Sequence, residues 1–150
     1  MNTFKCWIRR LCIAVLALFL FYLGFLNYTE PTQIGVARNM ITGEMWAQMS
    51  GGWHLTPPWV FVSRIDTRPI RVSVDSAGHG YSAKLVQFVS GEWESFVKTE
   101  GFRYWWWANR FSFNWGYRDE HRGMKDILRG YTYSPKKYPF IRVLEEYQEE

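Results

Sequence analysis

The chain has 150 residues, which is enough for one ordinary domain or for one domain with a membrane anchor. Hydrophobic residues make up 47% of it and aromatic residues 19%, which predicts a packed core and argues against a disordered chain. The net charge is +4, but all 14 acidic residues and all but three of the 18 basic residues lie after residue 28. The body is therefore nearly neutral, which argues against a nucleic-acid partner.

A membrane anchor is predicted near the N-terminus, where the sixteen residues from Leu11 to Leu26 carry no charge. Eleven of them are Leu, Ile, Val or Phe, which together favour insertion into a bilayer by ~3–7 kcal/mol. As a helix, the stretch from Arg9 to Tyr28 would span a hydrocarbon core of about 30 Å. The residues expected to define the anchor are two snorkelling arginines, apolar side chains and an interfacial aromatic: Arg9, Arg10, Leu11, Leu16, Leu20, Leu26 and Tyr28.

Two other interpretations of this segment are a cleaved signal peptide and a buried helix of a soluble protein. A signal peptide has small residues at its cleavage site, and no A-x-A pattern follows the apolar run. A soluble helix has a polar face, which this segment lacks. We therefore favour an uncleaved anchor.

The charges on either side of the anchor predict its orientation. Lys5, Arg9 and Arg10 precede the apolar run, whereas Arg38 is the first basic residue after it. The positive-inside rule then predicts residues 1–28 as a cytoplasmic stub with the transmembrane anchor, and residues 29–150 as a body on the far side. In a bacterium this describes an inner-membrane protein with a periplasmic domain, and the lipid bilayer is its first expected partner.

The first half of the body is predicted to form consecutive antiparallel strands. The segment Gln33–Met49 gives two short strands around a turn at Gly43. Apolar and polar residues then alternate through Trp59–Ile65, Ile70–Val74 and Tyr81–Ser90, which is typical of strands with one buried face.

The second half is predicted to be helical. A short helix is expected between Gly91 and Gly101, and another over 119–131, where apolar residues recur at helical spacing. The aromatics of 102–113 fit either period, and we favour a helix. A last helix is expected to begin near Pro139. Strands first and helices second predict an α+β domain.

Four short motifs follow the anchor in a fixed order. They are Ile34-Gly35-Val36, Thr42-Gly43, the stretch GGWHLTPP at 51–58, and RIDTR at 64–68. The series resembles the opening of the SPFH domain, also called band 7, of the stomatin, prohibitin and flotillin family, over about residues 30–75. The positions that carry the resemblance, with structural roles, are Gly35, Gly43, Gly52, His54, Pro58, Asp66 and Arg68.

The later half is similar to short SPFH-related proteins of bacteria and tailed phages, which carry stretches like Gly101–Tyr104 and Ile127–Tyr131. The resemblance implies a small SPFH-like domain after a single transmembrane helix. It also implies a non-enzymatic scaffold that forms homo-oligomers or docks on and modulates other integral membrane proteins. Membrane proteases and channels are such partners in the family, and a host membrane complex would be the target of a phage-encoded member.

No pattern of catalytic or metal-binding residues is found in the sequence. The histidines His54, His79 and His121 are scattered without metal-ligand spacing, and no G-x-S-x-G or phosphate-loop motif is present. Asp66 and Arg68 are predicted to be a structural pair or solvated charges, and His121 a solvated residue at a helix start. We therefore expect no enzyme activity, no catalytic or metal-binding residue and no cofactor.

The aromatic run Tyr104-Trp105-Trp106-Trp107 leaves three interpretations open. It can contribute to the core with one edge exposed, contact a membrane or partner protein, or stack on sugars. The candidate contact residues are Arg103, Trp105, Trp106 and Trp107. An alternative function is therefore a membrane-tethered periplasmic module that holds a cell-wall or other ligand. A third is a small hydrolase that uses Asp66, His54 or His121.

Overall fold

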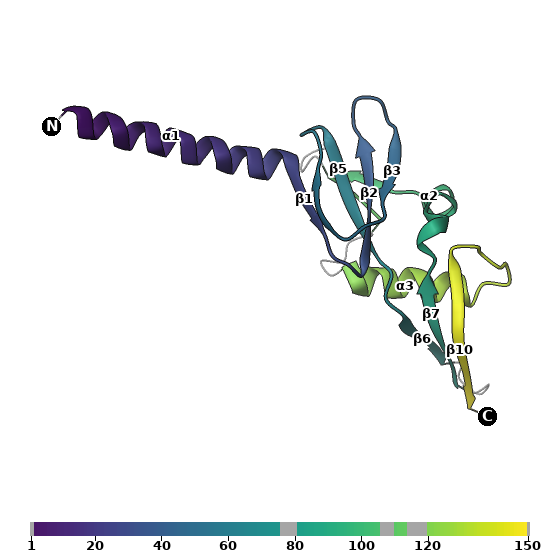
Figure 1. Cartoon of the computed structure of the whole chain (residues 1–150). Coiled ribbons are helices and arrows are strands. Elements are labelled where there is room, and N and C mark those ends of the chain that lie inside the picture. The colour runs from purple at the N-terminus through teal and green to yellow at the C-terminus, as the bar shows by residue number, and fades with distance from the viewer. Residues whose placement is uncertain (1, 76–80, 106–109, 114–119, 150) are drawn as a thin grey trace.

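The computed structural model describes residues 2–75, 81–105, 110–113 and 120–149. A long N-terminal helix projects from a domain of short antiparallel sheets that pack on a helix crossing beneath them (Figure 1). The elements are α1 (Asn2–Phe25), β1 (Leu26–Thr29), β2 (Gln33–Asn39), β3 (Met45–Gln48), β4 (Gly52–Leu55), β5 (Val60–Asp66), β6 (Ile70–Asp75), β7 (Tyr81–Phe88), the 3-10 helix η1 (Ser90–Glu92), α2 (Trp93–Glu100), β8 (Arg103–Trp105), β9 (Arg110–Ser112), α3 (Glu120–Thr132) and β10 (Ile141–Glu149).

Two three-stranded antiparallel sheets form the centre of the domain, in the orders β3-β2-β5 and β10-β7-β6. Helix α3 contacts β5 and β6, and so covers both sheets. Its buried residues Met124 and Leu128 lie four apart, which places them on one side of the helix. The buried apolar core contains Ile34, Val36, Ile65, Ile70, Val72, Val86, Phe88, Phe96, Phe111, Phe113, Met124, Leu128 and Phe140.

Most of the predicted strands and two of the predicted helices are confirmed. Strands β2 and β3 form the expected hairpin, with Gly43 at a φ of 76° in its turn. The three alternating segments form β5, β6 and β7. Helix α2 ends where the N–H of Gly101 donates to the carbonyl of Val97, and α3 matches the predicted helix over 119–131. The fold is therefore α+β with antiparallel sheets.

The prediction of a helix over 102–113 is wrong. Strands β8 and β9 pair antiparallel there, with Tyr104 opposite Phe111. Strand β9 lies against β5, and Phe111 and Phe113 are both buried in the core. The aromatics of 102–113 fitted both the helical and the strand period, so the local pattern did not distinguish a helix from a strand. The contact of β9 with β5 favours the strand.

The last predicted helix is also wrong, because 141–149 forms strand β10 at the edge of the second sheet. Strand β7 pairs with β6 on one side, and β10 satisfies the backbone groups on its other side. A β-bulge at Leu144 inserts one extra residue into the strand. The bulge breaks the strict alternation, so the apolar residues of β10 resemble a helical stripe. Strands therefore also follow the helices, which departs from the predicted order.

Helix α1 ends at Phe25, three residues before the predicted end of the anchor. Leu26–Thr29 instead forms β1, which pairs with Gly52–Leu55 of β4. These two strands make a separate two-stranded sheet, called here the ribbon. The sequence predicted consecutive strands, each beside the next one along the chain. Strand β4 departs from this order, because it pairs with β1.

Candidate membrane-facing site

Helix α1 has an apolar surface that the described part of the domain leaves uncovered. From Cys6 to Phe25 the helix is long and apolar enough to cross a membrane, and none of this stretch is buried. A signal sequence near an N-terminus has the same length and composition. Leu11, Leu16 and Leu20 each expose more than half of their surface. Both arginines of the predicted anchor, Arg9 and Arg10, are exposed toward the outer end.

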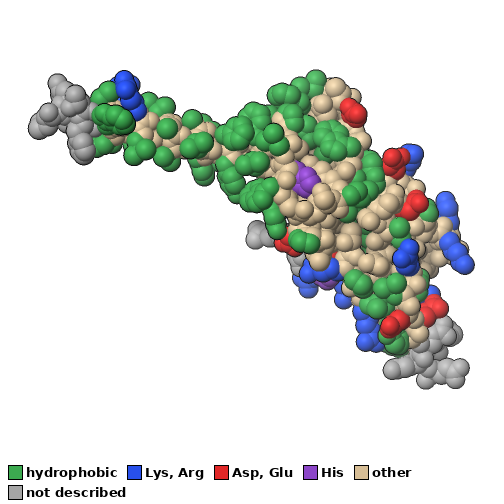
Figure 2. All heavy atoms as spheres, in the orientation of Figure 1, with side chains coloured by type: hydrophobic (Ala, Val, Ile, Leu, Met, Phe, Trp, Pro, Cys, Tyr) green, Lys and Arg blue, Asp and Glu red, His purple; other side chains and the backbone are tan. Residues whose placement is uncertain are grey.

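One face of the ribbon continues this apolar surface onto the domain. Leu26 lies opposite Leu55, and Tyr28 opposite Trp53, so all four side chains share one face. Of these, Tyr28 is 41% exposed, Trp53 59% and Leu55 69%. Figure 2 shows hydrophobic side chains along the helix and on the adjoining end of the domain, with Lys and Arg mostly away from this junction.

Aromatic contacts join the helix to the ribbon. The ring of Trp53 lies 5.7 Å from that of Tyr22 on α1 and 5.1 Å from that of Tyr28 on β1, measured between centroids. Tyr and Trp carry an apolar ring with a polar group, a combination that suits the boundary between lipid and water. We define the membrane-facing surface as the apolar side chains of α1 together with Leu26, Tyr28, Trp53 and Leu55.

Hydrogen bonds on the opposite face fix the ribbon to the end of the helix. The side-chain amide of Asn27 donates to the carbonyl of His54 at 3.2 Å and to the Thr56 hydroxyl at 3.0 Å. The Thr56 N–H donates to the carbonyl of Phe25 at 2.8 Å, which satisfies one of the last carbonyls of α1. The direction in which α1 leaves the domain is therefore set by polar contacts and not by packing alone.

The residues that carry the family resemblance lie at turns and close contacts. Gly43 and Gly52 have positive φ angles of 76° and 124°. Gly35 lies at a close contact between β2 and its neighbours, since a Cβ there would come within 2.9 Å of the Gln48 and Val62 side chains. A ring nitrogen of His54, Nε2, lies 2.8 Å from the carbonyl oxygen of Ser50. Pro58 lies in the turn that leads into β5.

Asp66 and Arg68 form the predicted structural pair. Asp66 is buried at the end of β5, and both Nε and Nη2 of Arg68 donate to its carboxylate, at 3.0 and 2.5 Å. His121 lies in the first turn of α3 with its side chain 41% exposed, as predicted, and its Nδ1 also lies 2.9 Å from Oδ2 of Asp66. Burial alone would raise the pKa of Asp66, but hydrogen bonds from Arg68 and His121 outweigh it and hold the pKa below its ordinary value. The cluster ties β5 to the first turn of α3.

The aromatic run is only partly described. Arg103 is exposed on β8, and its guanidinium lies 5.9 Å from the ring centroid of Trp105, which is half-buried. Trp106 and Trp107 lie outside the described residues, as does His79. Arg103 and Trp105 are not part of the membrane-facing surface.

Sequence reasoning missed the contribution of β4 to this surface. Trp53 and Leu55 flank His54, and Leu26 and Tyr28 flank Asn27, which is the same alternation of apolar and polar residues. That alternation was the available signal. In the part of the chain that the structure describes, no three His, Cys, Asp or Glu side chains are placed to hold a metal ion.

Comparison of this chain with models of protein families, with curated proteins and with solved structures gave no match.

Proposed function

We propose that this chain is a non-enzymatic membrane protein that stays anchored through α1 and organises other membrane proteins or further copies of itself. The observation that carries the proposal is the uncovered apolar surface that runs from α1 onto the ribbon. An apolar surface of this extent is stable in water only when something covers it. A bilayer covers the helix, and its interfacial region covers the ribbon.

The contacts at the junction support an anchor that is retained. Removal of α1 would take away the ring of Tyr22 from Trp53 and the Phe25 carbonyl that accepts from Thr56. It would also leave Trp53 and Leu55 in water, and burying two such side chains contributes about 2–4 kcal/mol. These losses are the reason for proposing that the helix is retained.

The scaffold function rests on the resemblance to the SPFH family together with this anchored arrangement. Members of that family assemble beside membranes and modulate integral membrane proteins such as proteases and channels. A nearly neutral body without a pattern of catalytic residues suits the same use here. Lys5, Arg9 and Arg10 lie at the N-terminal end of α1, ahead of its uncharged run. This placement supports a cytoplasmic N-terminus with the body on the other side, which in a bacterium is the periplasm.

The proposal is tested in native membranes that contain the full chain. Membranes are washed at alkaline pH, treated with an amine-reactive cross-linker, and solubilised, and the products are identified by mass spectrometry. We expect the chain to stay in the washed membranes with an intact N-terminal helix, and to appear in discrete products with a second copy or another integral membrane protein. Release by the wash, a mature N-terminus beyond Phe25, or monomers alone would contradict the proposal.

Orientation is tested separately, with an alkaline phosphatase reporter fused after Glu150. This reporter folds only after export, so an active fusion is expected. A cytoplasmic reporter fused at the same position serves as the control and should give no signal. The opposite pair of results would reverse the proposed topology and leave the anchor itself intact.

A further inference from the structure

A pocket of about 510 Å³ lies in the part of the domain away from α1, where the last turn of α3 and the loop after it meet β7 and β10 (Figure 1). This volume is within the usual range for small-ligand sites. Its walls combine lysine side chains with tyrosine rings and apolar residues of β10, a composition that the scaffold proposal does not explain. We call it the lysine pocket.

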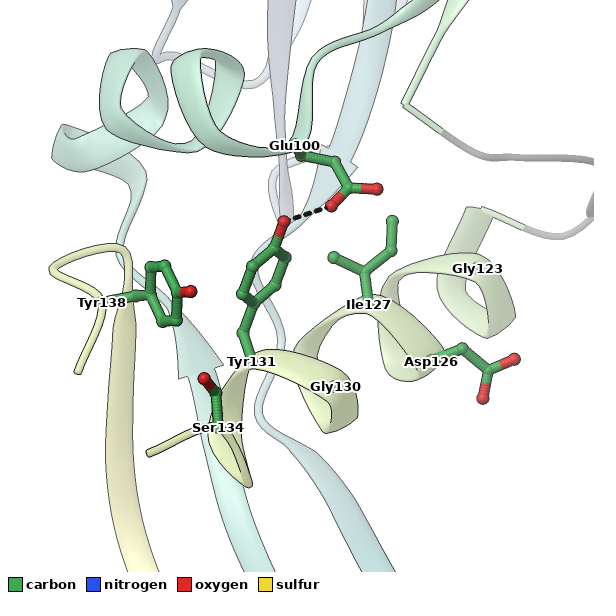
Figure 3. Close-up of a pocket in the computed structure, with 8 residues that line it drawn as sticks. All are labelled: Glu100, Gly123, Asp126, Ile127, Gly130, Tyr131, Ser134 and Tyr138. Atoms are coloured by element: carbon green, nitrogen blue, oxygen red, sulfur yellow. Dashed lines mark hydrogen bonds between the residues drawn. The ribbon is translucent and has the colours of Figure 1, made fainter. Parts of the chain in front are cut away.

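Two tyrosine rings form one wall of the lysine pocket. The rings of Tyr131 and Tyr138 pack edge to face with their centroids 4.7 Å apart. Figure 3 shows the neighbouring pocket, in which the same two rings lie side by side above Ser134, and all three residues line both pockets. Ile141 and Val143 of β10 add apolar surface to the lysine pocket. These walls suit a flat apolar group.

The lysine pocket carries two positive charges that no described carboxylate neutralises. Its charged side chains are three lysines and one glutamate. Lys84 pairs with that glutamate, Glu146, whereas Lys136 and Lys137 form no ion pair with a described residue. The Lys136 ammonium lies 5.5 Å from the ring centroid of Tyr138, a contact that leaves its charge in place. The charge of the pocket therefore favours an anion.

Capping of α3 does not account for these two lysines. Lysine side chains near the end of a helix often donate to its last carbonyl groups. Here the carbonyls of Arg129 and Tyr131 accept instead from the backbone N–H groups of Tyr133 and Ser134, both at 3.3 Å. The lysine ammonium groups are therefore not needed at these two carbonyls.

A buried hydroxyl at the end of α3 is a second, independent sign of a ligand. Thr132 lines the lysine pocket, and its Oγ1 is buried without a hydrogen-bond partner among the described residues. A helical threonine can donate to the carbonyl four residues earlier, and a buried hydroxyl that makes no hydrogen bond lowers stability. Thr132 thus adds a hydrogen-bond donor from which a ligand oxygen can accept.

We propose that the lysine pocket binds a phosphate monoester carried on a flat apolar group. At neutral pH such a phosphate carries a charge of about −1.5 to −2, which matches the two lysines. Its oxygens accept from Lys136, Lys137 and the Thr132 hydroxyl. Its apolar group lies against the rings of Tyr131 and Tyr138. The inference does not depend on the scaffold proposal, since it rests on this pocket alone.

The test is an NMR titration of the labelled full chain in a non-ionic detergent, observing the Val143 methyl groups and the Lys137 amide. The probe is phenyl phosphate, with phenol as the uncharged control. We expect saturable shifts with phenyl phosphate and none of similar size with phenol. Inorganic phosphate should bind more weakly, by about tenfold or more, because it has no ring to bury. Equally tight binding of inorganic phosphate would overturn the assignment to an organic phosphate.

Lys137→Gln tests the charge. It should weaken phenyl phosphate binding by about tenfold or more, because it removes a charged donor. Lys125→Gln is the matched control, since Lys125 is exposed on α3 and does not line the pocket, and it should leave binding unchanged. Equal losses in the two variants would show a general attraction of anions and would overturn the site.

Thr132→Val separates binding from folding. It should raise the melting temperature by about 2–4 °C, because it removes a buried hydroxyl without a partner, and weaken phenyl phosphate binding by about tenfold. Thr99→Val is the control, because the Thr99 hydroxyl donates to the Ser95 carbonyl at 2.8 Å outside the pocket. It should not raise the melting temperature and should leave binding unchanged. Unchanged binding in Thr132→Val, equal binding of phenol, or no binding to the wild type would each overturn the proposal.

The source of the phosphate is distinguished with a capped phosphotyrosine, Nα-acetyl-phosphotyrosine methylamide. Binding at least as tight as that of phenyl phosphate supports a side chain of a partner protein, because the backbone caps are then tolerated. Weaker binding than that of phenyl phosphate supports a small-molecule ligand.

Discussion

Asp66 is the only charged side chain that the described part of the domain buries, and its position explains why the chain accepts the cost of burying it. Its carboxylate receives three donors from Arg68, the backbone N–H, Nε and Nη2, and lies against His121, which comes 55 residues later. It therefore connects the end of β5 to the start of α3. Both partner side chains are about half exposed, so only the Asp66 carboxylate is removed from water in this cluster.

Asp66→Asn is expected to lower the free energy of unfolding by about 1.5–3 kcal/mol at pH 7, the range for hydrogen bonds to a charged group. Because the folded-state pKa lies below the ordinary value, the charged form stabilises the fold above about pH 4, and this contribution is lost as the pH falls through the folded pKa. The difference in the free energy of unfolding between wild type and variant should therefore be largest at pH 7 and should shrink at acidic pH. Urea unfolding in a non-ionic detergent at several pH values measures it.

Asp75→Asn is the control for that experiment, because Asp75 is exposed at the end of β6 and undergoes the same chemical change. Its effect on unfolding should stay within about 0.5 kcal/mol. Equal stabilities of wild type and Asp66→Asn at pH 7 would show that the cluster does not stabilise the fold.

Gly35→Ala tests the close contact at the centre of β2. The new methyl group would lie 2.9 Å from the side chains of Gln48 and Val62 and 3.0 Å from the Thr29 hydroxyl. Overpacking of this kind costs about 1–3 kcal/mol, so the variant should unfold at a lower urea concentration than the wild type. Gly91→Ala is the control, because a Cβ there meets nothing within 4 Å, and it should unfold at the same urea concentration as the wild type. A Gly35→Ala variant as stable as the wild type would mean that β2 and its neighbours separate more easily than the structure indicates.

At the scale of the elements, the sequence predicted the parts of the fold in which each strand or helix has a single buried face. Strands β5, β6 and β7 were predictable from their alternation, and α3 from its apolar stripe. The β10 strand was not, because the bulge at Leu144 interrupts its alternation and its pairing with β7 is a contact between distant segments. Local pattern cannot indicate such a partner.

The candidate site was predictable only in part for the same reason. The apolar run gave the helix, but nothing in its composition indicates that the chain leaves the helix at Leu26, where pairing with Leu55 begins. The Asp66–Arg68 pair follows from residues two apart, whereas the contact with His121 depends on where α3 lies.

Deletion of Leu144 tests the bulge in β10. Val143 lies opposite Val86 and Glu145 opposite Leu85, so removing the extra residue between them preserves the pairing on both sides. We expect the deletion to change the free energy of unfolding by less than about 1 kcal/mol, since Leu144 is also exposed. Chemical denaturation followed by circular dichroism measures the effect.

Deletion of Leu85 on β7 is the matched comparison. Leu85 pairs with Arg71 on one side and Glu145 on the other, so its loss shifts two ladders by one residue and turns the following side chains to the wrong face. This variant should not fold. Similar effects of the two deletions would contradict the assignment of the bulge.

For the whole molecule, the arrangement separates two surfaces. The membrane-facing surface lies where α1 joins the ribbon, while α3 and β10 lie on the part of the domain away from α1 (Figure 1). Cys6–Phe25 has 20 residues, which as a helix matches a hydrocarbon core of about 30 Å. In the proposed arrangement, Phe25 would lie at the edge of that core, the ribbon would lie in the head-group layer, and α3 would face water.

This orientation predicts the depth of individual side chains. In a cysteine-free background (Cys6→Ser, Cys12→Ala), an environment-sensitive fluorophore is attached to a new cysteine at Leu55 on the ribbon or at Leu144 on β10, both exposed apolar positions. In lipid vesicles, the label at position 55 should emit at shorter wavelength and be quenched by spin-labelled lipids, because it lies in the interfacial region. The label at position 144 should behave as it does in water. If both labels report water, α1 holds the domain away from the bilayer and the ribbon's apolar face must be covered by protein instead.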